Sequence, residues 1–76
     1  MTDTAALFDI IDRSGLKLKF IASQIGLSYQ GFKNKLDNKS DFTATEINRL
    51  CDLLNITDLN TKDRIFFARP VDLKST

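Results

Sequence analysis

The sequence predicts an all-α fold, a compact bundle of about five short helices in one domain. The chain has 76 residues, near the lower limit for a domain that folds alone. Apolar residues recur at spacings of three and four along most of it, and hydrophobic residues make up 42% of the chain, enough for one packed core. We expect a domain over residues 1–69, followed by a short tail over 70–76 because Pro70 ends any regular element.

The first helix is expected near the N-terminus of the chain. Leu7, Ile10 and Ile11 form its apolar stripe. Thr4 is a candidate N-cap, and Ser14-Gly15 closes the helix because glycine adopts the left-handed backbone at helix ends.

Two short helices joined by a glycine-containing turn are expected over about 18–37. Gly26 ends the first helix, Leu27 points into the core, and Ser28 caps the second by accepting a hydrogen bond from a free N–H at its start. The buried sides of both helices carry apolar residues: Ile21, Ala22, Ile25, Phe32 and Leu36. This order of elements is that of the helix-turn-helix, which presents its second helix to DNA.

The best-signalled helix start of the chain lies further on, after a polar connection. Thr43 and Glu46 have the spacing of a capping box, and Phe42 and Ile47 that of a hydrophobic staple. The apolar stripe of this helix consists of Ile47, Leu50, Cys51 and Leu54, and we interpret Cys51 as a core thiol. A fifth helix is expected over about 58–66, although residues 65–67 fit an extended segment equally well.

Composition excludes several classes of protein. One cysteine and no histidine exclude a disulfide framework and a zinc finger. The chain has no glycine-rich phosphate loop and no carboxylate cluster, so we expect neither an enzyme nor a metal or cofactor site. A membrane span of about 18 apolar residues is missing, as is a signal peptide, which predicts a cytoplasmic protein without a membrane partner.

Positive charge is concentrated on the predicted helix-turn-helix. The net charge is only +1, but residues 17–39 sum to +4 and the following residues 40–61 to −3. The positive block consists of Lys17, Lys19, Lys33, Lys35 and Lys39. Lysines that flank a recognition helix are placed to meet phosphates. The alternative is a solvated lysine-rich face with no ligand.

The chain resembles the lambda-repressor-like (Cro/C1-type, XRE) helix-turn-helix family over about residues 5–67. The resemblance is carried by Ala22, Gly26, Leu27, Ser28, Phe32, Leu36, Asn38-Lys39, Phe42-Thr43 and Leu53-Leu54-Asn55-Ile56. It implies a DNA-binding fold. A compact chain with no second domain is further similar to small regulators of temperate-phage genetic switches, such as Cro-like proteins or modulators of repression.

The resemblance also implies roles for individual side chains in binding an operator in double-stranded DNA. The expected base contacts come from Tyr29, Gln30, Lys33 and Asn34. The expected phosphate contacts come from Lys17, Lys19, Ser28 and Lys39. Glutamine and asparagine amides can pair with adenine, a contact that discriminates against a wrong base by about 1–3 kcal/mol. Alternatively, Gln30 and Asn34 are ordinary exposed polar residues.

Three departures from the family pattern favour an alternative function. Leu18 offers no donor where many members contact phosphate, Gly31 replaces a hydroxyl residue, and the net charge of +1 gives weak attraction to DNA. The alternative is an antirepressor or corepressor that binds a partner helix-turn-helix repressor and little DNA alone. Its expected interface residues are Leu18, Tyr29, Phe67 and Val71, and apolar residues near the C-terminus would also suit a homodimer.

Overall fold

The computed structural model describes residues 1–68, in which all regular secondary structure is helical. Five helices follow one another: α1 (Thr4–Ser14), α2 (Leu18–Gln24), α3 (Tyr29–Leu36), α4 (Ala44–Leu54) and α5 (Leu59–Phe66). The predicted all-α bundle is therefore confirmed, and its fifth segment is helical rather than extended. The predicted tail, with Val71, lies outside the described residues.

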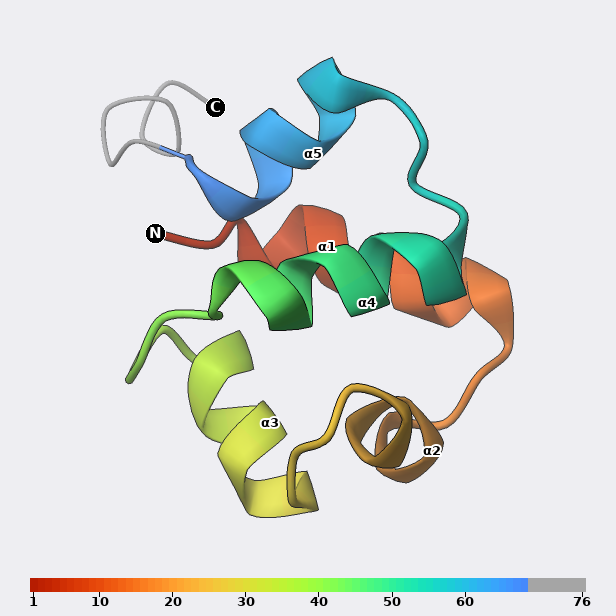
Figure 1. Cartoon of the computed structure of the whole chain (residues 1–76), viewed down its shortest axis with the longest axis vertical. Helices are drawn as coiled ribbons and strands as arrows, with labels where there is room; N and C mark the ends of the chain where they lie inside the picture. The colour runs from red at the N-terminus through yellow and green to blue at the C-terminus, as the bar shows by residue number, and fades with distance from the viewer. Residues whose placement is uncertain (69–76) are drawn as a thin grey trace.

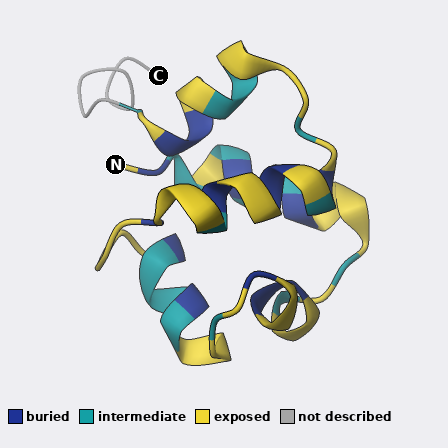
Figure 2. Ribbon diagram, viewed as in Figure 1, coloured by how far each residue is buried: buried dark blue, intermediate teal, exposed yellow. Residues whose placement is uncertain are grey.

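The helices form two groups around a central pair. α1 and α4 lie across the middle, with α5 on one side of them and α2 and α3 on the other (Figure 1). α2 packs against α3 and α4, whereas α1 packs against α4 and α5. Buried residues face the interior of the bundle and exposed residues face outward (Figure 2). None of the helices described has both the length and the apolar character needed to cross a membrane.

One cluster of buried side chains forms the core. It contains most of the predicted core residues, Ala22 among them, and is completed by Phe42, Ile65 and Phe66, and Cys51 is buried as expected. Ile10 and Leu27, which were predicted in the core, are half-buried at its edge. The ring of Phe42 meets Phe32 and Phe66 edge-on, with centroids 6.1 Å and 5.8 Å apart. This loop residue therefore joins the helix-turn-helix to α5.

The predicted cap of α1 is wrong by one residue. Asp3, not Thr4, is the N-cap, and its carboxylate accepts a hydrogen bond of 3.1 Å from the Ala6 N–H. Thr4 is instead the first helical residue, and its hydroxyl donates to the Leu36 carbonyl at 2.6 Å. Gly15 closes α1 as predicted, with φ +73°.

The turn between α2 and α3 has the predicted chemistry. Gly26 adopts φ +83°, a backbone conformation that favours glycine. The Leu27 N–H donates to the Ala22 carbonyl at 2.9 Å, which closes the end of α2 before α3 begins. The angle between the two helices is thus set by a short, hydrogen-bonded turn.

Asn38 fastens the end of α3 to the N-terminus of the chain. Its side chain accepts a hydrogen bond from the Thr2 N–H and donates one to the Thr2 carbonyl, both at 2.9 Å. Its backbone has φ +60°, which asparagine tolerates better than most residues. These contacts hold the last turn of α3 against residues that are far away in the sequence.

Candidate nucleic-acid interface

Two amide side chains lie one helical turn apart on α3. Gln30 Nε2 donates a hydrogen bond of 3.0 Å to Asn34 Oδ1, so the two predicted base-contacting amides lie side by side. This bond uses one N–H of Gln30 and the carbonyl oxygen of Asn34, and it leaves the Gln30 carbonyl as an acceptor and the Asn34 amino group as a donor. An adenine edge presents one donor and one acceptor in the major groove. The amide pair can therefore match adenine with one group from each residue.

Tyr29 connects the start of α3 to α2. Tyr29 is the first residue of α3, and its side chain is 42% exposed. Lys19 Nζ lies 6.0 Å from the centroid of the tyrosine ring, which is within the range of a cation–π contact. Lys33, the fourth predicted base-contacting residue, is half-buried on the same helix. The four predicted base contacts thus come from one short helix whose first residue is also held by a lysine of α2.

The N-terminus of α3 is capped by Ser28, as predicted. Ser28 Oγ accepts a hydrogen bond of 3.0 Å from the Gly31 N–H, and the hydroxyl hydrogen remains able to donate to a phosphate. A Cβ atom at Gly31 would lie only 3.0 Å from Ser28 Oγ. A side chain at this position would thus be in tight contact with the capping hydroxyl.

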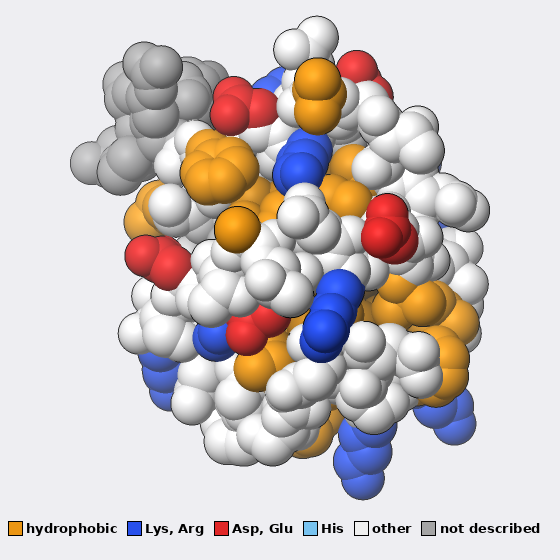
Figure 3. All heavy atoms as spheres, in the orientation of Figure 1, with side chains coloured by type: hydrophobic (Ala, Val, Ile, Leu, Met, Phe, Trp, Pro, Cys, Tyr) orange, Lys and Arg blue, Asp and Glu red, His pale blue; other side chains and the backbone are white. Residues whose placement is uncertain are grey.

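Three of the predicted phosphate contacts are exposed lysines. Lys17 and Lys19 lie at the start of α2, and Lys39 follows α3. Lysine and arginine side chains gather along the lower edge of the molecule in Figure 3, over α2 and α3. In the described part of the chain these three lysines have no carboxylate within 4.0 Å. Their charges are therefore available to a ligand.

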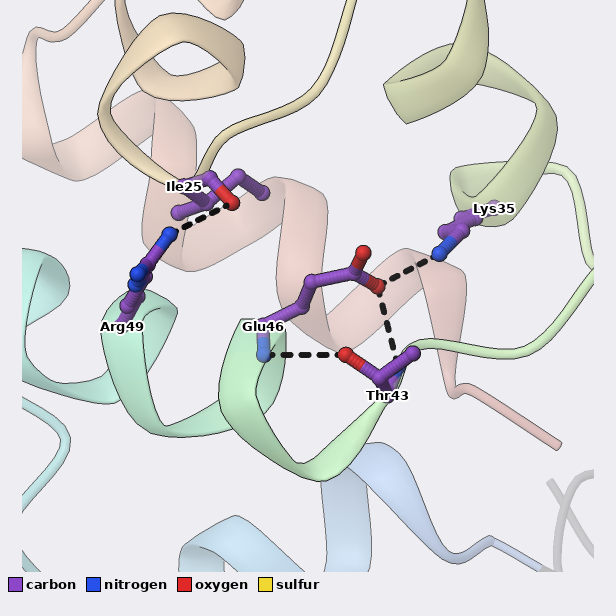
Figure 4. Close-up of polar contacts among 5 residues, drawn as sticks. All are labelled: Ile25, Lys35, Thr43, Glu46 and Arg49. Carbon is purple, nitrogen blue, oxygen red and sulfur yellow. Dashed lines mark hydrogen bonds and ion pairs between the residues drawn. The ribbon is translucent and has the colours of Figure 1, made fainter.

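Lys35 belongs to the same lysine block but has a different environment. Its Nζ forms an ion pair with Glu46 Oε1 of α4 at 2.5 Å, and the two side chains are only 15% and 13% exposed. Glu46 Oε1 also accepts a hydrogen bond of 2.9 Å from the Thr43 N–H, and the Glu46 N–H donates to Thr43 Oγ1 at 3.2 Å (Figure 4). The predicted capping box is present, and its Glu46 carboxylate also pairs with a lysine of α3.

The Glu46 carboxylate is stabilised in its charged form. Burial by itself raises its pKa, but the hydrogen bonds from Lys35 and the Thr43 backbone, together with the Lys35 charge, lower the pKa below its ordinary value. The charge of Lys35 is thus compensated inside the protein. Lys35 contributes less to a DNA-binding surface than its place in the sequence suggests.

α4 also supports the end of α2. Arg49, one turn after Glu46, donates a 3.5 Å hydrogen bond to the Ile25 carbonyl (Figure 4). A Cβ atom at Gly26 would lie 3.1 Å from Arg49 Nη1, so the turn approaches this side chain closely. Glu46 and Arg49 therefore hold α3 and the end of α2 from the same helix.

Of the residues predicted to bind a partner, the three that the structure describes are divided between two surfaces. Leu18 and Tyr29 line a common hollow of about 520 Å³, here called the α1–α2 groove, whose walls include Phe8, Leu16, Lys17, Leu18, Lys19 and Tyr29. Phe67 is 58% exposed just after α5 and does not line this groove. Val71 lies outside the described residues.

Three residues of the exposed and groove surfaces were missed in the sequence. Phe8 and Leu16 line the α1–α2 groove, and Phe20 of α2 is 45% exposed. The position of Phe20 was open to prediction, because it lies about 150° around the helix from the middle of the buried stripe formed by Ile21, Ala22 and Ile25. Phe8 and Leu16 carry no such signal, since their grouping depends on how α1 meets α2.

No protein-family model, curated protein or solved structure matches this chain. Across residues 1–68 no three histidine, cysteine, aspartate or glutamate side chains come together in a group that could hold a metal ion.

Proposed function

We propose that this chain is a small helix-turn-helix transcriptional regulator that binds operator DNA by placing α3 in the major groove. The observation that carries the proposal is the Gln30–Asn34 amide pair, with a 3.0 Å hydrogen bond between the two side chains, on the helix that follows the glycine turn. The resemblance to the lambda-repressor-like family supports the same role. On that resemblance we further propose a phage genetic switch, acting in the cytoplasm of a bacterial host.

In this proposal the contacts divide into base readers and phosphate binders. Gln30 and Asn34 read adenine, while Tyr29 and Lys33 reach neighbouring bases. Lys17, Lys19 and Lys39, with the Ser28 hydroxyl, bind the phosphate backbone on either side. Three lysine–phosphate contacts predict that the logarithm of the binding constant falls with the logarithm of salt concentration with a slope of roughly −3.

Alanine substitutions on α3 test the proposal. We expect Gln30→Ala and Asn34→Ala each to weaken binding to the promoter region beside the gene by about 1–3 kcal/mol, measured by fluorescence anisotropy at low salt. Because the two amides are hydrogen-bonded to each other, the double variant should lose less than the sum of the single variants. Asn60→Ala removes an exposed amide from α5 and serves as the matched control.

Two results would contradict this function. One is the failure of the purified chain to bind any duplex that covers its promoter region at low salt. The other is an equal loss of affinity in Asn60→Ala and in the α3 variants, because α5 lies on the opposite side of the bundle from α3 (Figure 1).

The α1–α2 groove favours a second candidate function, an antirepressor or corepressor that binds a partner helix-turn-helix repressor. Leu18 and Tyr29, two of the predicted partner contacts, both line this groove. We expect a stable heterocomplex with a repressor encoded next to it, and Tyr29→Ala should weaken that complex in analytical ultracentrifugation. A mixture that sediments as two separate proteins would contradict this candidate.

A further inference from the structure

The α1–α2 groove is an apolar hollow next to the DNA-facing side of the helix-turn-helix. Phe8 comes from α1, Leu16 from the connection, Leu18 from α2 and Tyr29 from α3. Phe8, Leu16 and Leu18 are half-buried and pack against the core, so the core fixes the position of these walls. Three helices therefore meet around a surface that is apolar and open to solvent.

The charges around the groove are unequal. Lys17 and Lys19 lie on its α2 side, both exposed, and neither has a carboxylate within 4.0 Å among residues 1–68. Asp12 lies on the α1 side and is exposed as well. An occupant that brings negative charge to the α2 side would meet two uncompensated cations, whereas a basic occupant would meet one anion.

The lining of the groove identifies the chemical class of the occupant. The apolar walls formed by Phe8, Leu16 and Leu18 give no hydrogen bonds to phosphates, so a nucleic acid backbone does not fit between them. An amphipathic helix fits, because it inserts apolar side chains into a groove and keeps charged side chains on its flanks. Acidic flanks on the side of Lys17 and Lys19 complete the match.

We propose that the α1–α2 groove binds an acidic amphipathic helix of a partner protein, and that this helix and DNA exclude one another. Lys17, Lys19 and Tyr29 are needed by both ligands, since they line the groove and also belong to the proposed DNA interface. Only the exclusion rests on the proposed DNA-binding function. The docking of the helix rests on the groove itself.

A designed peptide tests the docking with the full chain. The probe is a fluorescent helical peptide with a leucine and phenylalanine stripe flanked by glutamates, and its control carries lysines in place of the glutamates. We expect the acidic peptide to bind more tightly and to shift the NMR amide signals of Leu16, Leu18 and Tyr29. Tyr29→Ala should weaken binding by about tenfold or more, as for an aromatic anchor.

A charge reversal separates docking from general stickiness. In the double variant Lys17→Glu/Lys19→Glu, both positions are exposed, so the fold should persist by circular dichroism, and the preference should switch to the basic peptide. Leu59→Ser removes a 77% exposed side chain from α5 and should change neither affinity. Equal affinity of the wild type for both peptides, no binding of the acidic one, or shifts confined to α5 would overturn the docking.

A competition experiment then tests the exclusion. A promoter duplex that binds the chain should release the labelled acidic peptide, seen as a fall in anisotropy. Simultaneous binding of both ligands would overturn the exclusion. Peptide binding without any DNA binding would contradict the proposed DNA function while the docking stands, and DNA binding without peptide binding would do the reverse.

Discussion

Lys35 and Lys17 belong to the same positive segment of the chain but stand in different environments. Lys35 lies where α3 meets α4, is 15% exposed and is paired with Glu46. Lys17 precedes α2, is exposed and has no carboxylate within 4.0 Å in the described residues. The sum of +4 over residues 17–39 counts both equally, yet Glu46 of the following acidic segment compensates one of them. Charge along a sequence therefore overestimates the charge that this surface offers to a ligand.

The largest expected effect on stability comes from a substitution on the buried side of α3. Phe32 is fully buried and meets Phe42 edge-on. We expect Phe32→Ala to lower the free energy of unfolding by about 3–5 kcal/mol, because it leaves a cavity in the core. Urea denaturation measures this loss. Tyr29→Ala, at an exposed aromatic of the same helix, is the matched control, and an equal loss there would contradict the division of α3 into a buried and an exposed side.

The next largest effect on stability distinguishes two lysines of α3. Lys35→Met leaves Glu46 with a desolvated and unpaired charge, so we expect it to lower the free energy of unfolding by about 1–3 kcal/mol. Lys33→Met removes a lysine that has no carboxylate within 4.0 Å in residues 1–68, and its stability should change by no more than about 0.5 kcal/mol. Thermal or urea unfolding of both variants checks the order. The reverse order would show that the Lys35–Glu46 pair contributes no stability.

A smaller effect concerns pH. The pKa of Glu46 is lowered in the folded chain from its ordinary value of 4.5, so its contribution to stability is present above that value and is lost as the pH falls through it toward the lowered value. We expect the stability difference between wild type and Glu46→Gln to shrink over this acid range in urea denaturation. A difference that stays constant would show that the carboxylate charge is unimportant. Asp58 titrates in both proteins, so its own lowered pKa cancels in the difference.

The smallest effect is expected at the exposed ion pair of α1. Arg13 and Asp9 are 3.2 Å apart, but their side chains are 79% and 58% exposed. We expect Asp9→Asn to change the free energy of unfolding by about 0.5 kcal/mol or less, because solvent screens the pair. Urea denaturation checks this value. A loss as large as that of Lys35→Met would mean that burial does not distinguish the two ion pairs.

Local features of this chain were predictable because each depends on a few adjacent residues. Thr43 and Glu46 form the capping box and Ser28 caps α3, as their spacing indicated. The cap of α1 was displaced to Asp3 because two neighbouring residues both have capping side chains, and only the backbone geometry distinguishes them. The pairing of Gln30 with Asn34 also follows from the helical repeat.

The contacts between helices were not predictable in the same way. Lys35 and Glu46 are eleven residues apart, and Asn38 and Thr2 are thirty-six apart. Their side chains meet only because of the way in which α3 packs beside α4 and the N-terminus. The groove formed by Phe8, Leu16, Leu18 and Tyr29 has the same origin, since its walls come from three helices and a connection.

The sequence by itself thus determined the all-helical fold, the glycine turn between α2 and α3, and the side chains that α3 carries. Hydrogen bonds and apolar spacing within one or two turns suffice for these features. The tertiary structure alone decided which lysine is compensated by a carboxylate, which side chains of α4 contact α2 and α3, and where the apolar groove lies beside them. These depend on distances between segments remote in the chain, which local chemistry does not fix.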